Sequence, residues 1–405
     1  MSAVPTDPDP FIQQLLNEGY ELEILHQHLL VYGIPYVNAQ REVCSGILAV
    51  AYTGSRQDGV AARPKNHTIW LQGELPHHAA SDKPMGDVVN HSNTQNLFEG
   101  FSGNHYFSNK PNNVVPSNFY ELVIHYHSLL RAEAQQIDPN ADGRTGKVRP
   151  NRDPASVFHY PDTASCRSGI TGLSQRLKDY RVAIIGVGGT GSYILDLMAK
   201  TSVKEIHLFD GDTFDSHNAF RSPGIATLDE VNRSENKALF FQERYQQFRK
   251  GIISHPYRVN ADNLVKLDDF DFTFSCIDGG ISRKLICEYL SNKGRGFIDT
   301  GIGMKLHSFD GAPDELAGAC RVTACTQEKN DHLDRCLDYA PDDGNLYDSN
   351  IQVADMNALN AAMAVIRWKQ VVGIYQDQER AHNLTLATSL QSLHREEYEE
   401  TPWPE

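Results

Sequence analysis

Hydrophobic and polar positions are arranged differently in the two halves of the chain. From residue 169 onward, short apolar runs alternate with segments whose apolar residues recur at helical spacing. This alternation is typical of a mostly parallel sheet with helices on both faces. The expected strands cover residues 182–187, 205–209, 253–259, 272–277, 296–299 and 316–326. The expected helices cover residues 192–199, 234–248, 282–292 and 354–373. The second half is therefore predicted to be an α/β domain with a doubly wound sheet.

The first part of the chain has the order of a smaller α+β domain. A helix-like segment precedes three runs rich in β-branched and aromatic residues, which indicate strands. The helix is expected over 11–19 and the strands over 22–38, 46–54 and 67–75. A polar loop over 76–113 and a second helix over 118–137 follow, and the segment 138–164 is predicted to be a linker. The predicted domains are therefore residues 1–160 and 161–405.

Composition narrows the class of protein. The chain of 405 residues is longer than one typical core requires, and a net charge of −15 argues against a general nucleic-acid binder. Its apolar runs are too short for a membrane span, and the N-terminus lacks the features of a secretory signal, so we expect a cytoplasmic protein. The seven cysteines form no C-x-x-C pair, which predicts reduced thiols rather than a zinc site.

A glycine-rich turn joins the first strand of the second half to its helix. The sequence RVAIIGVGGTGSYILDL, from Arg181 to Leu197, has the strand–turn–helix order of a nucleotide-binding turn. Gly186 permits the tight turn, Gly188 lets the backbone approach a phosphate, and Gly191 lets helix and strand pack closely. Glycine turns also close ordinary strand–helix corners, so the turn alone leaves both interpretations open.

The strand that follows ends in an aspartate at a suitable spacing. Asp210 comes 24 residues after Gly186, close to the separation at which a Rossmann-like unit presents a carboxylate to a ribose hydroxyl. The sequence therefore predicts that the turn holds an adenosine.

Polar residues follow the strands of the same domain. They are Asp212, Asn218, Arg221, Lys237 and Asp278. Each by itself is about as easily explained as a solvated surface group. Together, at strand ends where open α/β sheets bind ligands, they favour phosphate chemistry over hydride transfer, because cations neutralise phosphates and carboxylates hold a metal.

The ordered motifs GVGGTG, FDGDTFDSHNAFR, the lysine of SENKA, SCIDGGISRK and FIDTGIGM resemble the ThiF/MoeB/ubiquitin-activating-enzyme family of ATP-dependent adenylyltransferases. The resemblance covers about residues 166–375. It implies a doubly wound, Rossmann-like sheet and a site for ATP and Mg²⁺. The implied ATP-binding residues are Gly186, Gly188, Gly189, Gly191, Asp210, Asp212, Asn218, Arg221 and Lys237. Asp278 is implied as the Mg²⁺ ligand, and Arg221, Lys237 and Asp278 as catalytic residues.

The resemblance also implies partners. Family members adenylate the C-terminal glycine of a ubiquitin-like or sulfur-carrier protein, and an arginine ahead of the first strand reaches the ATP of the partner subunit. Arg167 is the best match for that arginine, which implies a homodimer. Many relatives then transfer the acyl group to a cysteine before the last helix. Cys336 is the candidate here, as a nucleophile or as an incidental surface thiol, while Ser349 stands nearer the helix.

The first domain is loosely similar to ubiquitin-conjugating enzymes, which occur fused to activating domains in bacterial ubiquitin-like conjugation operons. No cysteine lies in the polar loop 76–113. The similarity therefore implies an inactive docking domain, which suggests a conjugating enzyme as a further partner. Two other functions stay open: an NAD-dependent oxidoreductase, and a nucleotide-binding scaffold without turnover.

Overall fold

The computed structural model describes residues 9–52, 62–110, 114–151, 156–168, 170–308, 311, 313–340 and 351–396. The chain divides into two compact units. The first comprises Met1–Asp153 and Tyr160–Gln175, and the second comprises Pro154–His159 and Arg176–Glu405.

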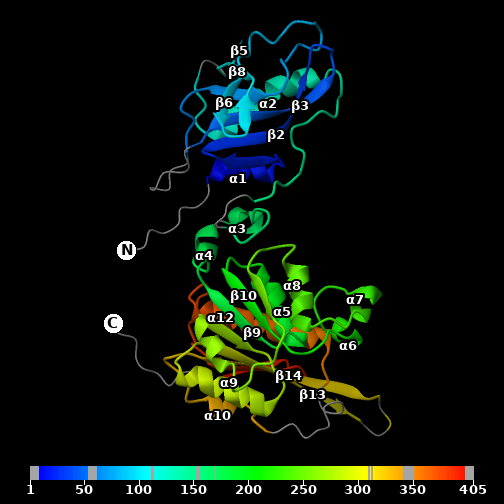
Figure 1. Cartoon of the computed structure of the whole chain (residues 1–405), viewed down its shortest axis with the longest axis vertical. Coiled ribbons are helices and arrows are strands. Elements are labelled where there is room, and N and C mark those ends of the chain that lie inside the picture. The colour runs from blue at the N-terminus through cyan, green and yellow to red at the C-terminus, as the bar shows by residue number, and fades with distance from the viewer. Residues whose placement is uncertain are drawn as a thin grey trace. The chain divides into compact units, whose positions relative to one another are not determined.

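The first unit is an antiparallel sheet with two helices packed against it (Figure 1). The strand order is β1-β2-β3-β4-β8-β5. The strands are β1 (Leu22–Leu25), β2 (His28–Val37), β3 (Val43–Ala51), β4 (Thr68–Gln72), β5 (Val89–His91) and β8 (His105–Ser108). Helix α2 (Phe119–Ala134) lies against β2, and α1 (Pro10–Asn17) packs against α2. This is the smaller α+β domain that the sequence predicts.

The prediction of a polar loop over 76–113 is partly wrong. It contains β5 and β8 together with a separate hairpin of β6 (Gln95–Phe98) and β7 (Phe101–Gly103). These strands have three or four residues each, and polar side chains interrupt their apolar alternation. A short strand of this kind gives almost no periodic signal, although Phe107 of β8 is completely buried.

The predicted linker is also partly wrong, because residues 138–149 pack on the first unit. The Gly146 N–H donates to the carbonyl oxygen of Gly19 at 2.9 Å, and Arg149 forms an ion pair with Glu21 at 3.1 Å. Short polar contacts hold this segment where a linker would be solvated.

The second unit is built on an eight-stranded sheet in the order β11-β10-β9-β12-β13-β14-β15-β16. Its strands are β9 (Arg181–Ile185), β10 (Glu205–Phe209), β11 (Ile252–His255), β12 (Phe272–Ser275), β13 (Phe297–His307), β14 (Glu315–Cys325), β15 (Asn383–Ala387) and β16 (Ser392–Glu396). In this order, the strands from β11 to β13 are parallel to one another, and each strand from β14 to β16 runs antiparallel to the strand before it. The predicted doubly wound, mostly parallel α/β sheet is confirmed.

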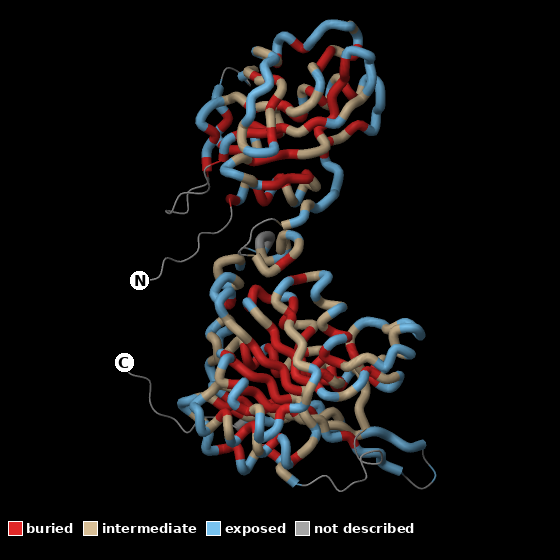
Figure 2. Tube along the Cα trace, in the orientation of Figure 1, coloured by how far each residue is buried: buried red, intermediate tan, exposed pale blue. Residues whose placement is uncertain are grey.

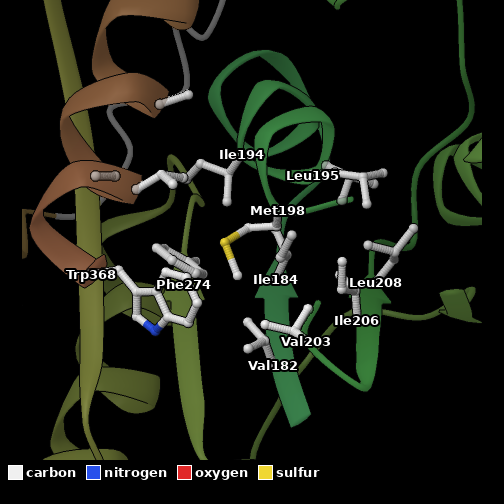
Figure 3. Close-up of a cluster of buried hydrophobic side chains, with 14 of the residues drawn as sticks. Val182, Ile184, Ile194, Leu195, Met198, Val203, Ile206, Leu208, Phe274 and Trp368 are labelled. Carbon is white, nitrogen blue, oxygen red and sulfur yellow. The ribbon is translucent and has the colours of Figure 1, made fainter. Parts of the chain in front are cut away.

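The central strand β9 is buried on both faces, which explains its continuous apolar sequence. Val182 and Ile184 face α5 (Gly189–Ala199), α8 (Lys237–Tyr245) and α12 (Ala354–Val371), where Met198 and Trp368 fill the core (Figure 3). Ala183 and Ile185 face α9 (Gly280–Asn292) on the opposite side. Buried positions accordingly follow the central strands in Figure 2.

The hairpin of β15 and β16 was not predicted. Residues 383–387 and 392–395 are half-buried or exposed, and the two strands extend the antiparallel edge of the sheet beyond β14. A two-stranded edge without a buried apolar face resembles a polar tail in sequence. Within the described residues, no helix is both long and apolar enough to cross a membrane.

The buried imidazole of His127 makes the stability of the first unit depend on pH. Its Nε2 accepts the Gly143 N–H at 3.0 Å, so its proton lies on Nδ1 and is donated to the Tyr20 hydroxyl at 2.6 Å. Burial lowers the pKa of His127 from 6.5 to about 4. A second proton on Nε2 would face the Gly143 N–H, and the Asp142 carboxylate, 3.7 Å from Nε2, offsets only part of the cost of burying the charge.

We therefore expect His127 to leave the free energy of unfolding unchanged above pH 6.5. As the pH falls from 6.5 toward 4, the unfolded state takes up the proton first, and the free energy of unfolding should decrease by up to about 3 kcal/mol. Chemical denaturation between pH 7 and pH 4.5 measures this slope. The His127→Gln variant, whose amide can replace both hydrogen bonds without titrating, should show a shallower slope. Equal slopes in both proteins would contradict the assignment.

Candidate functional site

The glycine turn brings β9, β12 and α5 into close backbone contact. Gly186 has φ +84° and donates its N–H to the carbonyl oxygen of Phe209 at 2.8 Å. A Cβ atom on Gly186 would lie 2.6 Å from the carbonyl oxygen of Cys276, and one on Gly191 would lie 1.8 Å from that of Gly186. Only glycine fits at these two positions.

The next two glycines face different surroundings. A Cβ atom on Gly188, the N-cap of α5, would meet no described atom within 4 Å beyond its chain neighbours, so the backbone here is open to a ligand. A Cβ atom on Gly189 would instead lie 2.4 Å from the side chain of Asn357 on α12. Asn357 also accepts a hydrogen bond from the Thr190 hydroxyl at 3.0 Å, which fixes the first turn of α5. Gly188 is therefore the glycine that an incoming group can approach.

Asp210 ties the end of β10 to the glycine turn. Its carboxylate accepts the N–H groups of Val187 and Asp212, each at 2.9 Å, and the side chain is 8% exposed. Burial raises the pKa of Asp210, although the positive charge of Lys237 opposes this shift. Each carboxylate oxygen keeps a further acceptor position, so the group can still receive a hydroxyl proton.

The segment before α8 closes over the end of β10. Asn236, the N-cap of α8, donates to the carbonyl oxygens of Asp210 and Asp212, and its own oxygen accepts from the first turn of the helix. The Lys237 ammonium lies 3.2 Å from Asp212, which also pairs with Arg258 at 2.6 Å. Burial alone would raise the pKa of Asp212, but these two cations outweigh it and the pKa is lowered.

Asn218 and Arg221 carry donors without acceptors. Asn218 caps α6 (Ser216–Ala219) by accepting the Asp215 N–H at 2.9 Å, and it is 1% exposed. Within the described part of the chain, its Nδ2 has no hydrogen-bond partner, and neither has Nε of Arg221. The pKa of His217 is lowered by burial and then by the charges of Arg221 and Lys237, so both cations lie near it. Buried donors of this kind indicate an acceptor that the protein does not supply.

Asp278 follows β12 and is exposed. Its carboxylate accepts a hydrogen bond from Gln352 at 3.1 Å, just ahead of α12. No cluster of three or more His, Cys, Asp or Glu side chains suited to a metal occurs among the described residues. A Mg²⁺ ion held mainly by phosphates needs only one or two protein carboxylates, so Asp278 fits that role.

Arg167 and Cys336 are the remaining predicted residues. Arg167 is the last residue of α3 (Thr163–Arg167), and its side chain is outside the described part of the structure, as is Ser349. Cys336 is the last residue of α10 (Leu333–Cys336), whose Leu333 packs with residues of α9 and β13. Among the predicted residues, described contacts join the glycine turn, Asp210, Asp212 and Lys237. Asn218 and Arg221 are joined to each other, since the Arg221 N–H donates to the Asn218 carbonyl oxygen at 3.1 Å.

Sequence reasoning missed a buried charge network beside Asp278. Asp299 on β13 is completely buried and accepts the Ser275 hydroxyl at 2.8 Å and Arg321 at 2.5 Å. Arg283 on α9 lies 3.4 Å from the same carboxylate. Asp299 sits inside the FIDTGIGM motif, so a charged residue within an apolar strand was the available signal. Asn357 gave no comparable signal, because it lies in an ordinary helical pattern.

The fold and the turn define an α/β protein of the doubly wound class, with a nucleotide-type glycine turn at the carboxyl end of its sheet. Residues 166–399 match the model of the ThiF family, and the chain belongs to this family, as its motifs predict. Residues 10–163 match a second model, described as a domain of unknown function (DUF6791).

Curated relatives match over part of their length. The chain is 24% identical over 189 residues to ubiquitin-like modifier-activating enzyme 5 of Drosophila persimilis, covering 43% of this chain and 47% of that protein. It is 28% identical over 154 residues to the same enzyme of Branchiostoma floridae, covering 34% and 36%. The chain thus spans less than half the length of these relatives.

Solved structures with a similar fold include MccB of E. coli with MccA-N7isoASN, at 16% identity and a TM-score of 0.46, covering 56% of this chain and 67% of that one. PaaA is 18% identical with a TM-score of 0.44, covering 56% and 66%.

The unpaired amide of Asn218 provides a direct test of anion binding. In Asn218→Asp, the carboxylate can still accept the Asp215 N–H, so the cap of α6 is retained, but the unpaired donor becomes a negative acceptor. We expect ATP affinity to fall roughly 10- to 100-fold, as measured by calorimetry below the melting temperature of the variant, which is lowered because the new carboxylate is buried. Unaltered affinity would show that Asn218 has only a capping role.

Proposed function

We propose that the second unit is an ATP-dependent adenylyltransferase that activates the C-terminal carboxylate of a ubiquitin-like or sulfur-carrier protein. The observation that carries this proposal is the pair of donors without a described partner, Asn218 Nδ2 and Arg221 Nε, in a segment where Arg221 and Lys237 both lower the pKa of His217. Membership of the ThiF family and the names of the curated relatives support the same activity.

The proposed reaction joins two anions. An oxygen of the acceptor carboxylate attacks the α-phosphorus of ATP, the bond between the α-phosphorus and the bridging oxygen breaks, and pyrophosphate leaves. The open backbone at Gly188 receives phosphate oxygens at the N-terminus of α5. Arg221 and Lys237 offset the repulsion between carboxylate and phosphate and stabilise the charge that develops on the leaving group.

The other residues orient the nucleotide and its metal. Asp210 is held by two backbone N–H groups and accepts a ribose hydroxyl with its remaining capacity. Asp278 holds Mg²⁺, which neutralises phosphate charge when bound. Gln352 donates to the Asp278 carboxylate and so restricts its orientation.

The acyl adenylate then either leaves the site or is attacked at its acyl carbon by the Cys336 thiolate, which forms a thioester and releases AMP. We propose the first unit as a docking domain for a protein partner, such as a conjugating enzyme, because its sheet and flanking helices form a core independent of the second unit. In this proposal the chain acts as a homodimer, with Arg167 reaching the nucleotide of the partner subunit.

Two cations on Asp212 form a matched pair for testing the activity. Lys237 is 9% exposed and lies near Asp210 and His217, whereas Arg258 is 78% exposed and pairs with the outer side of Asp212. We expect Lys237→Ala to lower exchange of pyrophosphate into ATP, with a ubiquitin-like protein ending in glycine, by at least about 100-fold. Arg258→Ala should change it by less than about threefold.

Nucleotide binding and pyrophosphate exchange together distinguish an adenylyltransferase from an oxidoreductase and from a scaffold without turnover. Binding of NAD without binding of ATP would replace the proposal with an oxidoreductase. Tight ATP binding without exchange, across a panel of small proteins ending in glycine, would indicate a scaffold. Equal losses in both variants would remove Lys237 from the reacting centre.

The role of Arg167 can be tested in mixed oligomers. Arg167→Ala and Asp278→Ala each inactivate every site of a homodimer, but a hybrid dimer carries one site with both residues intact. We expect each hybrid dimer to show about half of the wild-type exchange, and a fully exchanged 1:1 mixture, in which about half of the dimers are hybrids, to show about a quarter. Confirmed subunit exchange without recovery would mean that Arg167 does not act across the dimer.

A further inference from the structure

Asp278 is carried by a short loop, residues 276–279, between the end of β12 and the start of α9. The loop has no side-chain cap on α9, whose N-cap is Gly279. A carboxylate on such a loop needs another group to fix its backbone. The structure provides one in Arg283, which is buried in the first turn of α9.

The guanidinium of Arg283 contacts three separate parts of the chain. One amino group donates to the carbonyl oxygen of Ile277 at 2.7 Å, and the other donates to that of Asp338 at 2.9 Å. The third contact is the ion pair with Asp299 at 3.4 Å. Arg283 therefore joins the loop before Asp278, the segment after α10 and the buried carboxylate of β13.

The segment after α10 packs closely on the same helical turn. A Cβ atom on Gly280 would lie 2.0 Å from the carbonyl oxygen of Ala340, and Lys284 lies over the ring of Tyr339 at 5.8 Å. Gln352, further along the chain, donates a hydrogen bond to Asp278 of the 276–279 loop. Residues on both sides of 341–350 thus contact the loop or the helical turn that follows it.

We propose that Arg283 is a positioning residue for Asp278: it clamps the 276–279 loop to the 338–340 segment and so fixes the carboxylate that holds the metal. This inference rests on the proposed function for the identity of the metal, but the clamp itself is independent of it. Arg283 acts through the carbonyl group of Ile277, directly before Asp278, and through that of Asp338.

Arg321 provides a matched control, because it pairs with the same buried Asp299. It donates to Asp299 and Thr323 and has no described contact with Ile277 or Asp338. Its contact with Asp299, at 2.5 Å, is shorter than that of Arg283. Replacing either arginine by methionine leaves Asp299 with one cation, but only Arg283→Met releases the two carbonyl oxygens.

The first measurement is hydrogen exchange in the full-length protein without nucleotide or metal. We expect Arg283→Met to accelerate exchange of the amides in 276–280 and 337–340 by at least 10-fold, and Arg321→Met to leave both segments within about twofold of wild type while lowering the melting temperature more. Arg283→Lys keeps the charge but cannot reach both carbonyl oxygens, so it should accelerate the same amides with a near-normal melting temperature. Equal effects of the two methionine variants, or unchanged exchange in Arg283→Lys, would overturn the clamp.

The second measurement is the affinity for Mn²⁺, used as a paramagnetic probe for Mg²⁺, in the presence of ATP. We expect a loss of about 10-fold in Arg283→Met and Arg283→Lys and less than twofold in Arg321→Met. An unchanged affinity in both Arg283 variants would overturn the link to Asp278. If the wild-type protein takes up no Mn²⁺ with ATP, the proposed function and the metal assignment both fail, and hydrogen exchange alone decides whether the clamp exists.

Discussion

The second unit depends on one constraint, which is that the backbone of α5 packs directly against the backbone of the glycine turn before it. A side chain at Gly191 would overlap the carbonyl oxygen of Gly186, and one at Gly186 would overlap that of Cys276. Since Cys276 also donates its N–H to Ile185, neither strand can shift to make room without losing ladder bonds. The absence of Cβ atoms thus brings β9, β12 and a helix N-terminus to one point, and the polar residues of the site are placed relative to it.

Polar contacts add to apolar packing in holding the loops around that point, where Val187 and Phe214 are buried in the core. The Asp210 carboxylate, at the end of β10, accepts the Val187 N–H of the glycine turn. The Asn236 side chain, at the start of α8, donates to the carbonyl oxygens of Asp210 and Asp212. Each buried bond contributes about 1 kcal/mol, and an unmade one costs more. Loops held in this way keep a defined geometry while leaving their outer faces polar, which suits a site for a charged ligand.

The sequence predicts well what depends on local pattern. The strands β9, β10 and β12, the helices that follow them and the residues at their ends are all readable, because buried parallel strands are continuously apolar and the glycine turn has a fixed spacing. Contacts between distant segments are not readable. Nothing around Asn357 shows that it meets Gly189, and nothing around Arg283 shows that it reaches Asp338, because both contacts arise from the packing of whole elements. The short strands β5 to β8 were missed for the opposite reason, since three or four residues carry too little pattern.

The contact between Thr190 and Asn357 has a consequence for how the chain is made. These two residues are 167 positions apart, and Asn357 lies on the last long helix of the described chain. During synthesis, the first turn of α5 therefore leaves the ribosome long before the residue that steadies it. A polypeptide interrupted before α12 would contain every glycine of the turn and still lack the side chain that fixes the first turn of α5.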